Sequence, residues 1–318
     1  MCIRYKRVSL IIVQYGDAKL LWNLLVSLER HPDRELIDEV IVVNNGLTLG
    51  EEDRTKLEAY EALPIRVIDN QQKSYASGVN RGAAAAAGEV LLIANNDIQW
   101  LPSSSIRPLI EYFDRNPRVG IAGPQLLYPD GRWQQSYGRF SSLLQAFVSL
   151  TLLDSVWHGI QKCLLTKNWL PKKVKRVQWV SGAFMAVRRE CFTELDGFNT
   201  CFSFYGEDTD FCWRARQVGW EVVFVPTARI IHIGGASSLS EPSNATRLFE
   251  AKEKFLHEGF GPRKTFWYMK IMQLAVLERL FLYNLIGTLT SSAVWKRRAH
   301  LAKERLKAVS ELLRKRRH

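Results

Sequence analysis

Short runs of β-branched and aliphatic residues alternate with helical patterns in the first part of the chain. The runs cover residues 8–13, 39–43, 65–68, 90–94 and 119–123. An amphipathic pattern of leucines follows the first run at residues 20–28, and a polar helical segment at 51–61 separates the second run from the third. Strands that alternate with helices predict βαβ units and a parallel sheet buried on both faces.

This alternation ends after the fifth run. Residues 124–140 are rich in Gly, Pro and aromatic side chains, and 142–170 form an apolar amphipathic stretch that ends in the basic segment 172–176. The stretch has the pattern of a core element, of a wall of an acceptor site or of a helix facing a membrane, and these remain open. Strand character returns at 177–189 and at 221–226.

The C-terminal part is apolar again between residues 266 and 295, but Lys270, Glu278 and Arg279 interrupt it. Its longest uncharged run, 280–295, has 16 residues, and a helix needs roughly 20 to span a bilayer. The pattern therefore predicts an interfacial or re-entrant helical segment. A helix that packs in the core or forms a dimer is the alternative.

Composition and charge narrow the class of protein. The 318 residues are 47% hydrophobic and 24% charged, which is typical of a folded chain with a sizeable core. The five cysteines form no C-x-x-C pair, so we expect neither a zinc knuckle nor a disulfide framework, and a reducing cytoplasm fits best. The N-terminus lacks the pattern of a secretory signal peptide.

The net charge of +12 is concentrated at one end of the chain. Residues 296–318 contain ten Lys or Arg and two Glu. A basic tail of this kind binds anionic lipid or nucleic acid, or is simply solvated.

Polar residues follow each predicted strand, at the sheet edge where ligands of parallel sheets bind. Tyr15, Asn45 and Asp69 lie at the ends of the first three runs and are suited to hydrogen-bonding a nucleoside. Asn80 and Arg81 lie in a segment of small residues that allows close helix packing or close approach of a ligand. That segment matches neither G-x-G-x-x-G nor the P-loop.

The fourth run ends directly in Asn95, Asn96 and Asp97. A carboxylate at the end of a buried strand can hold Mg²⁺ or Mn²⁺, which need one or two carboxylates and take phosphate oxygens and water as further ligands. The alternative is an Asx-type turn before a helix that we expect to start near Ser103.

Three carboxylates, Glu207, Asp208 and Asp210, lie within four positions at the start of an amphipathic helical pattern. We expect the positive end of this helix to keep them ionised, and an ionised carboxylate beside a cleft can act as a general base. Helix capping is the alternative interpretation. A further polar residue, His232, follows the last apolar run, and a single His of this kind is commonly structural.

The order of these elements resembles the large family of inverting glycosyltransferases with the GT-A fold, and within it the bacterial rhamnosyltransferase-like members. The resemblance covers residues 8–240 and is carried by 181–189, by 207–214 and by His232 with its trailing glycines. It implies an α/β, Rossmann-like GT-A fold, with a mixed, mainly parallel sheet flanked by helices and a C-terminal helical extension that associates with a membrane.

The implied division is a catalytic domain at 1–240, with a nucleotide-sugar-binding half at 1–123 and an acceptor half at 124–240. A basic helical extension at 241–318 follows it.

The resemblance also implies roles for single residues. Asp97 would bind Mg²⁺ or Mn²⁺ with His232 as second protein ligand, and Asp208 would be the general base with Glu207 beside it. The nucleotide-sugar side would consist of Tyr15, Asn45, Asp69, Asn80, Arg81, Asn95 and Asn96. The acceptor side would include Trp179, Gly182, Ala183 and Asp210. The chain departs from the family's D-x-D motif at Asn95, and has Asn44 and Asn45 where an Asp is frequent.

The function implied is transfer of a sugar, with rhamnose from dTDP-rhamnose as first choice, to a lipid-linked or polysaccharide acceptor in cell-surface polysaccharide biosynthesis. We expect the protein at the cytoplasmic face of the inner membrane, held to anionic lipid through 266–318, with a homodimer as a further possibility. A nucleotide-dependent oxidoreductase or epimerase is the alternative, and it lacks G-x-G-x-x-G. A nucleic-acid binder is the other alternative, but no nucleic acid is expected because the charge is confined to one end.

Overall fold

The computed structural model describes residues 7–150, 170–202, 205–234 and 242–315. The chain forms two compact units. The sheet unit comprises Met1–Phe140, Lys167–Ser203 and Glu207–Gly234, and the helical unit comprises Ser141–Thr166, Phe204–Gly206 and Gly235–His318. The stretch 141–166, which the sequence prediction assigned to the acceptor half, thus clusters with the helical unit.

A nine-stranded mixed sheet forms the centre of the sheet unit, in the order β3-β2-β1-β4-β10-β6-β11-β5, with β8 paired to β11. Four strands at one side are parallel: β1 (Val8–Gln14), β2 (Glu39–Asn45), β3 (Ile65–Asn70) and β4 (Val90–Asn95). All seven residues of β1 are buried, as expected for a strand with helices on both faces. The predicted mixed α/β sheet is confirmed.

The remaining strands of the sheet form both parallel and antiparallel pairs. They are β5 (Ile98–Trp100), β6 (Val119–Leu127), β8 (Lys175–Arg176), β10 (Phe184–Arg188) and β11 (Glu221–His232). β10 runs antiparallel to β4 and β6, whereas β6 and β11 are parallel. A separate two-stranded ribbon joins β7 (Tyr137–Gly138) to β9 (Trp179–Val180).

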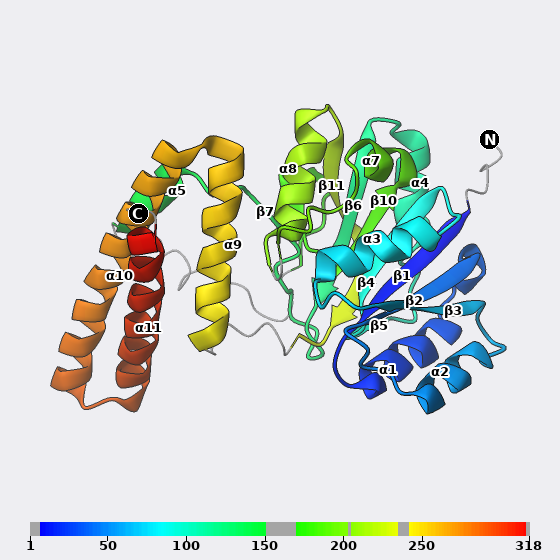
Figure 1. Ribbon diagram of the computed structural model, residues 1–318, viewed down its shortest axis with the longest axis horizontal. Helices are drawn as coiled ribbons and strands as arrows, with labels where there is room; N and C mark the ends of the chain where they lie inside the picture. The colour runs from blue at the N-terminus through cyan, green and yellow to red at the C-terminus, as the bar shows by residue number, and fades with distance from the viewer. Residues whose placement is uncertain (1–6, 151–169, 203–204, 235–241, 316–318) are drawn as a thin grey trace. The chain divides into compact units, whose positions relative to one another are not determined.

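Helices cover both faces of the parallel strands (Figure 1). The sheet unit contains α1 (Ala18–Glu29), η1 (Arg34–Leu36), α2 (Glu51–Glu58), α3 (Tyr75–Ala85), α4 (Arg107–Arg115), α7 (Arg189–Glu194) and α8 (Glu207–Gln217). The leucines of α1 pack in one core cluster with Leu10 and Ile12, while α3 packs in the other with Ile11 and Val13. A Cβ at Gly82 of α3 would lie 2.4 Å from the side chain of Ile11, so the small residues serve close helix packing.

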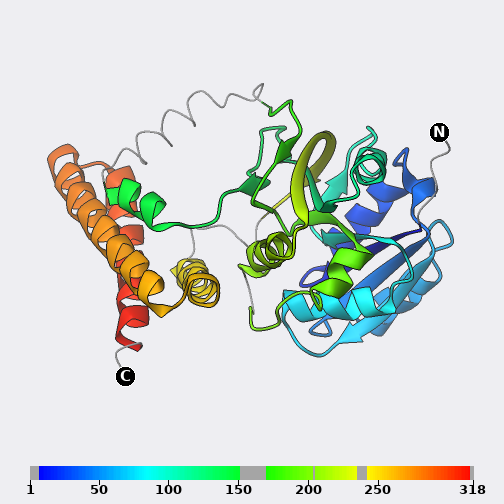
Figure 2. The same ribbon diagram turned by 90° about the horizontal axis from the view of Figure 1, so that it is seen from above.

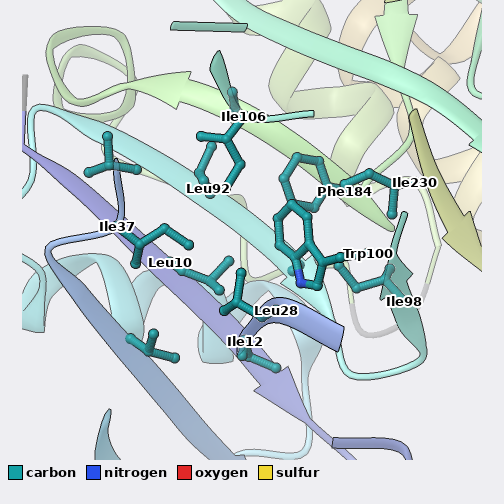
Figure 3. Packing of buried hydrophobic residues seen from close by; sticks show 14 of the residues in the cluster. Leu10, Ile12, Leu28, Ile37, Leu92, Ile98, Trp100, Ile106, Phe184 and Ile230 are labelled. Carbon is teal, nitrogen blue, oxygen red and sulfur yellow. The ribbon is translucent and has the colours of Figure 1, made fainter. Parts of the chain in front are cut away.

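The core on the α1 side continues under the short strand β5. Figure 3 shows Trp100 and Phe184 facing each other beside Ile98 and Ile230, with ring centroids 5.3 Å apart in an edge-to-face arrangement. Burial of these large side chains fixes β5 against β11.

Two boundaries differ from the sequence prediction. β11 is one strand from 221 to 232, and the gap expected near residue 226 is a bulge where the register shifts between Val225 and Arg229. The helix expected near Ser103 begins at Arg107. The carboxylate of the buried Asp33 accepts hydrogen bonds from the backbone N–H groups of residues 105, 106 and 107 at 2.9–3.0 Å, which fixes the helix start there.

The helical unit consists of α5 (Leu143–Leu150), α9 (Pro242–Phe260), α10 (Pro262–Thr290) and α11 (Ala293–Lys315). Figures 1 and 2 show α10 and α11 side by side as a hairpin, joined by a two-residue turn with Ser291 in the left-handed region. Residues 151–169 of the predicted amphipathic stretch lie outside the described residues. Within the helices that the structure describes, none combines the length and apolarity needed to cross a membrane.

Candidate active site

Asp208 lies in the first turn of α8, where two backbone segments hold its carboxylate. The Gly182 N–H donates to Oδ2 at 2.9 Å, and the Thr209 N–H donates to Oδ1 at 2.6 Å. A Cβ at Gly182 would lie 3.2 Å from the Asp208 Cβ, so a glycine allows this close approach. The predicted base and the predicted acceptor-side glycine are therefore in direct contact.

Burial raises the proton affinity of the two neighbouring carboxylates of α8. Burial raises the pKa of Glu207 to about 8, and the negative charge of Asp208 adds to the rise. Burial also raises the pKa of Asp208, although hydrogen bonds from Gly182 and Thr209 oppose it. The expectation that the helix end keeps these acids ionised does not hold for Glu207, because desolvation outweighs the helix dipole. Both carboxyls therefore hold a proton more tightly than they would in water, and the two titrate as a coupled pair.

Tyr75, at the start of α3, joins the two sides of the site. Its hydroxyl donates a 2.6 Å hydrogen bond to the Gly182 carbonyl. Burial raises the pKa of Tyr75 well above its usual value, and the charges of Glu207, Asp208 and Asp97 raise it further. The phenol thus stays neutral, and all three acids affect its pKa. The sequence prediction did not include Tyr75, because nothing in its helical segment distinguishes it from a packing residue.

Asp97 and His232 meet through the pairing of β5 with β11. Asp97 lies in the turn that leads from β4 into β5, and His232 pairs with Ile98 at the end of β11. The Ile233 N–H donates to the Asp97 carbonyl at 2.9 Å. As a result His232 Nε2 lies 3.2 Å from Asp97 Oδ1, and both side chains are largely buried.

Gln134 fixes the orientation of the His232 ring. Its Oε1 lies 2.9 Å from His232 Nδ1, and its own backbone N–H donates to Leu126 on β6. With the amide oxygen as acceptor, Nδ1 carries a proton, and Nε2 is the ring nitrogen that faces Asp97. Gln134 was also missed from the sequence, since it lies in the aperiodic segment 124–140.

The pair of Asp97 and His232 fits a divalent cation. Asp97 Oδ1 is buried and accepts no hydrogen bond within the described residues. Burial raises the pKa of this carboxyl, but contact with His232 and backbone N–H groups outweighs it, so the net pKa is lowered. Two ligand atoms bound in adjacent octahedral positions at about 2.1 Å would lie about 3 Å apart, close to the 3.2 Å observed.

The protein would supply only part of the coordination shell. Across residues 7–150, 170–202, 205–234 and 242–315, no three His, Cys, Asp or Glu side chains gather in a way that could hold a metal. Mg²⁺ and Mn²⁺ keep waters and bind substrate phosphates, so two protein ligands suffice.

The polar residues at the strand ends hydrogen-bond to neighbouring strand ends. Asn96 is buried and donates to Gln14 Oε1 at 2.8 Å and to the Tyr15 carbonyl at 2.9 Å. Asn45 Oδ1 accepts from Asn70 at 2.7 Å. The Asn95 backbone N–H donates to the Ala183 carbonyl at 3.0 Å, which joins the end of β4 to the segment before β10.

Tyr15 and Asp69 remain more open. The Tyr15 side chain is 49% exposed at the end of β1. Asp69 Oδ1 accepts from Asn44 at 3.0 Å and from Arg54 at 2.5 Å, so its carboxylate is oriented at the edge of β3.

Four predicted site residues have other contacts in the structure. Asn80 bonds through both ends of its amide to the backbone of Phe198, at 2.8 Å each, and Arg81 is exposed. Asp210 is buried and pairs with Arg214 at 2.8 Å. Trp179 donates its indole N–H to the Arg139 carbonyl at 3.1 Å. None of these contacts points to a role in the reaction.

The chain is similar to known proteins in both sequence and fold. It is 29% identical over 248 residues to N-acetylglucosaminyl-diphospho-decaprenol L-rhamnosyltransferase of Mycobacterium tuberculosis, covering 74% of this chain and 78% of that protein. The O-antigen chain rhamnosyltransferase RfbN of Salmonella typhimurium is 22% identical, with coverage of 80% and 76%.

Two solved structures share the fold. GalNAc-T7 with UDP, GalNAc and Mn²⁺ superposes with a TM-score of 0.61 at 16% identity, over 85% of this chain and 51% of that one, so this chain spans about half its length. Mannosyltransferase PcManGT from Pyrobaculum calidifontis, in complex with GDP-Man and Mn²⁺, gives 0.57 at 16% identity, with 97% and 87% coverage. The family model of Glycosyl transferase family 2 matches residues 9–195, more than half of the sequence. The chain belongs to glycosyl transferase family 2.

Proposed function

We propose that this glycosyltransferase is inverting and cation-dependent, and that it moves rhamnose from dTDP-rhamnose to a lipid-linked or polysaccharide acceptor in cell-surface polysaccharide biosynthesis. The observation that carries the proposal is that a backbone-held carboxylate and a carboxylate–imidazole pair lie on adjoining segments. Gly182 holds Asp208, and the next residue, Ala183, accepts a hydrogen bond from the backbone two residues before Asp97. Rhamnosyltransferases among the relatives support the choice of sugar.

Asp208 is the base on the acceptor side. Each of its oxygens already accepts hydrogen bonds, from Gly182 on Oδ2 and from Thr209 on Oδ1. Because a carboxylate oxygen can accept more than one hydrogen bond, the fixed group can still take the proton of an acceptor hydroxyl as that oxygen attacks the anomeric carbon. The pKa of Glu207, raised to about 8, favours its protonated form near neutral pH, so we assign the base to Asp208 and not to Glu207.

Asp97 and His232 act on the opposite side of the transferred sugar. They would hold Mg²⁺ or Mn²⁺ together with the diphosphate of the donor, with Gln134 keeping the His232 ring in place. The cation would offset the negative charge that develops on the departing nucleoside diphosphate. Direct displacement from the side opposite the leaving group requires no covalent intermediate and inverts the anomeric centre.

The helical unit supports an acceptor borne by a membrane at its cytoplasmic face. The α10 helix exposes one stripe of large apolar side chains at intervals of three, four and seven residues: Trp267, Leu274, Leu277, Phe281, Leu285 and Leu289. The segment 262–315 also contains twelve Lys or Arg and three Glu. An apolar stripe beside excess positive charge is typical of helices that lie in an anionic interface.

The Asp208→Asn variant should lose the base and little else. We expect kcat to fall about 10³-fold, because an amide cannot accept the hydroxyl proton, while dTDP-rhamnose still raises the melting temperature. The measurement is nucleotide release from dTDP-rhamnose with N-acetylglucosaminyl-diphospho-polyprenol as acceptor. Glu207→Gln is the matched control and should keep most of its neutral-pH activity; wild-type rates in Asp208→Asn would overturn the assignment of the base.

The proton on Glu207 can be tested through stability. A carboxyl whose pKa is raised in the folded state binds its proton more tightly there than when unfolded, so wild-type stability falls as pH rises from the unfolded pKa toward about 8. Glu207→Gln cannot ionise and escapes this loss. Its melting temperature relative to wild type should therefore increase between about pH 5 and about pH 8.5. The exposed Glu61→Gln variant serves as control, and an equal change in both variants would contradict the buried proton.

Loss of the Gln134 carbonyl should weaken cation binding without removing a ligand. Gln134→Leu keeps a side chain of similar bulk but leaves His232 Nδ1 without its acceptor, and we expect about tenfold weaker Mn²⁺ binding. Titration of Mn²⁺ followed by electron paramagnetic resonance, in the presence of dTDP, measures this directly. Gln135→Leu is the control at the adjacent exposed position. Equal affinity in the two variants would show that Gln134 does not orient the ligand.

The apolar stripe of α10 should determine membrane binding. The double variant Phe281→Asp, Leu289→Asp should lose flotation with phosphatidylglycerol vesicles, because two charges replace side chains that enter the interface. Leu47→Asp with Val26→Asp, two exposed apolar positions of the sheet unit, should float like wild type. Unchanged flotation combined with conversion of a dimer to a monomer would identify the stripe as a contact between subunits instead.

A further inference from the structure

A hollow on the sheet unit, separate from the site residues described above, has a strongly basic lining. It has a volume of about 660 Å³ and lies between the β7–β9 ribbon, β8 and the end of α8. Four cationic side chains line it, Arg139, Lys175, Arg176 and Arg216, together with one carboxylate, Glu221. We refer to it as the basic pocket.

Only one of these cations is neutralised by the carboxylate of the pocket. Arg176 Nε lies 3.0 Å from Glu221 Oε2. Lys175 donates to the Tyr137 hydroxyl at 3.2 Å, and Arg216 donates to the Val177 carbonyl at 3.3 Å. In the part of the chain that the structure describes, neither these two nor Arg139 pairs with an acid.

The positive charge of the basic pocket is separate from the positive charge of the C-terminal segment. Outside the cationic segment 262–315 the chain is close to electrically balanced, so three uncompensated cations around one concavity are a feature of this surface. A concave site lined by a single sign of charge concentrates its potential and attracts counter-ions. Arginine in particular pairs with phosphate through two parallel hydrogen bonds.

The ribbon connects the basic pocket to the base. Ser181 N–H donates to the Ser136 carbonyl at 3.0 Å, and Gly138 pairs with Trp179 farther along. Gln178 lines the pocket, and Gly182, four residues on, holds Asp208. Four residues of chain span at most about 14 Å, so Gln178, the lining residue nearest in sequence to Gly182, lies within about the length of a sugar and its phosphates from the residue that holds Asp208.

We propose that Arg139, Lys175 and Arg216 bind the phosphate groups of a prenyl-diphosphate-linked acceptor whose sugar lies at Asp208. The proposal rests on the proposed function, since it assigns the anionic part of the same acceptor. It gives the enzyme a means to select a sugar that carries a diphosphate lipid over the same sugar without one. The pocket thus determines acceptor affinity, and the chemical step stays with Asp208.

The experiment compares two acceptors that differ only in phosphate. One is N-acetylglucosamine linked through diphosphate to a short prenyl chain, and the other is a neutral alkyl glycoside of the same sugar. The double variant Arg139→Gln, Arg216→Gln should raise KM for the diphosphate acceptor at least about tenfold, with kcat and the KM of the neutral acceptor unchanged. The control double variant Arg115→Gln, Arg132→Gln removes the same charge outside the pocket and should behave as wild type.

Three results would overturn the proposal. One is an equal rise of KM for both acceptors, and another is no change for either. The third is an effect seen only when phosphatidylglycerol vesicles are present, which would make the pocket a site for phospholipid headgroups.

A binding measurement separates this proposal from the proposed function. Calorimetric titration with farnesyl diphosphate, against farnesol as control, needs no transfer reaction. Wild type should bind the diphosphate and the Arg139→Gln, Arg216→Gln variant should bind it at least about tenfold more weakly. If the wild-type protein transfers no sugar but binds farnesyl diphosphate more tightly than the variant does, the proposed function fails and the phosphate site stands. If the two proteins bind the diphosphate equally, the phosphate site is disproved.

Discussion

The pairing of the short strand β5 with the end of β11 is the constraint on which the site depends. Asp97 and His232 are far apart in the sequence and meet only because His232 pairs with Ile98 and Ile233 donates to the Asp97 carbonyl. A slip of one residue would turn His232 to the opposite face of the sheet. Burial of Trp100 against Phe184 opposes such a slip, since the indole ring of β5 would leave the core.

The electrostatics of the site follow from the same gathering of residues. Asp97, Glu207 and Asp208 all raise the pKa of Tyr75, so three acids act on one partly buried region. Such a region can hold several carboxylates only if one keeps its proton or a cation shares the space. Glu207 takes the first solution, with its pKa raised to about 8. The lowered pKa of Asp97 leaves that carboxylate ionised and suited to the second.

The sequence predicted those features that have a local signal. The buried parallel strands and the polar residues at their ends follow from apolar runs bounded by Asn and Asp. The acidity of α8 alone does not distinguish Asp208 from Asp210; the family resemblance selected Asp208 as the base, and that assignment stays a prediction. The i,i+4 spacing of Asp210 and Arg214 was a usable sign of an internal ion pair.

Tyr75 and Gln134 could not be predicted, since each acts through a long-range contact. The Tyr75 hydroxyl reaches Gly182, and Gln134 reaches His232 across the sheet unit. Asn80 shows a structural role that the sequence did not indicate. Its polar side chain near small residues suggested a ligand, but both ends of its amide are bound to the backbone at Phe198.

The two halves of the site differ in how they are built, and this bears on specificity. The side that we propose for the donor rests on long parallel strands with helices on both faces, where side-chain positions are fixed by packing on every side. The side that we propose for the acceptor rests on the two-residue strands β7 and β9 and on the glycine contact at Asp208. Short surface ribbons tolerate substitution more readily than a buried sheet does. Changes of acceptor should therefore arise through substitutions in residues 136–140 and 175–182. The strand pairing that holds Asp97 to His232 should stay intact, because a change in that pairing would alter the leaving-group side for every acceptor.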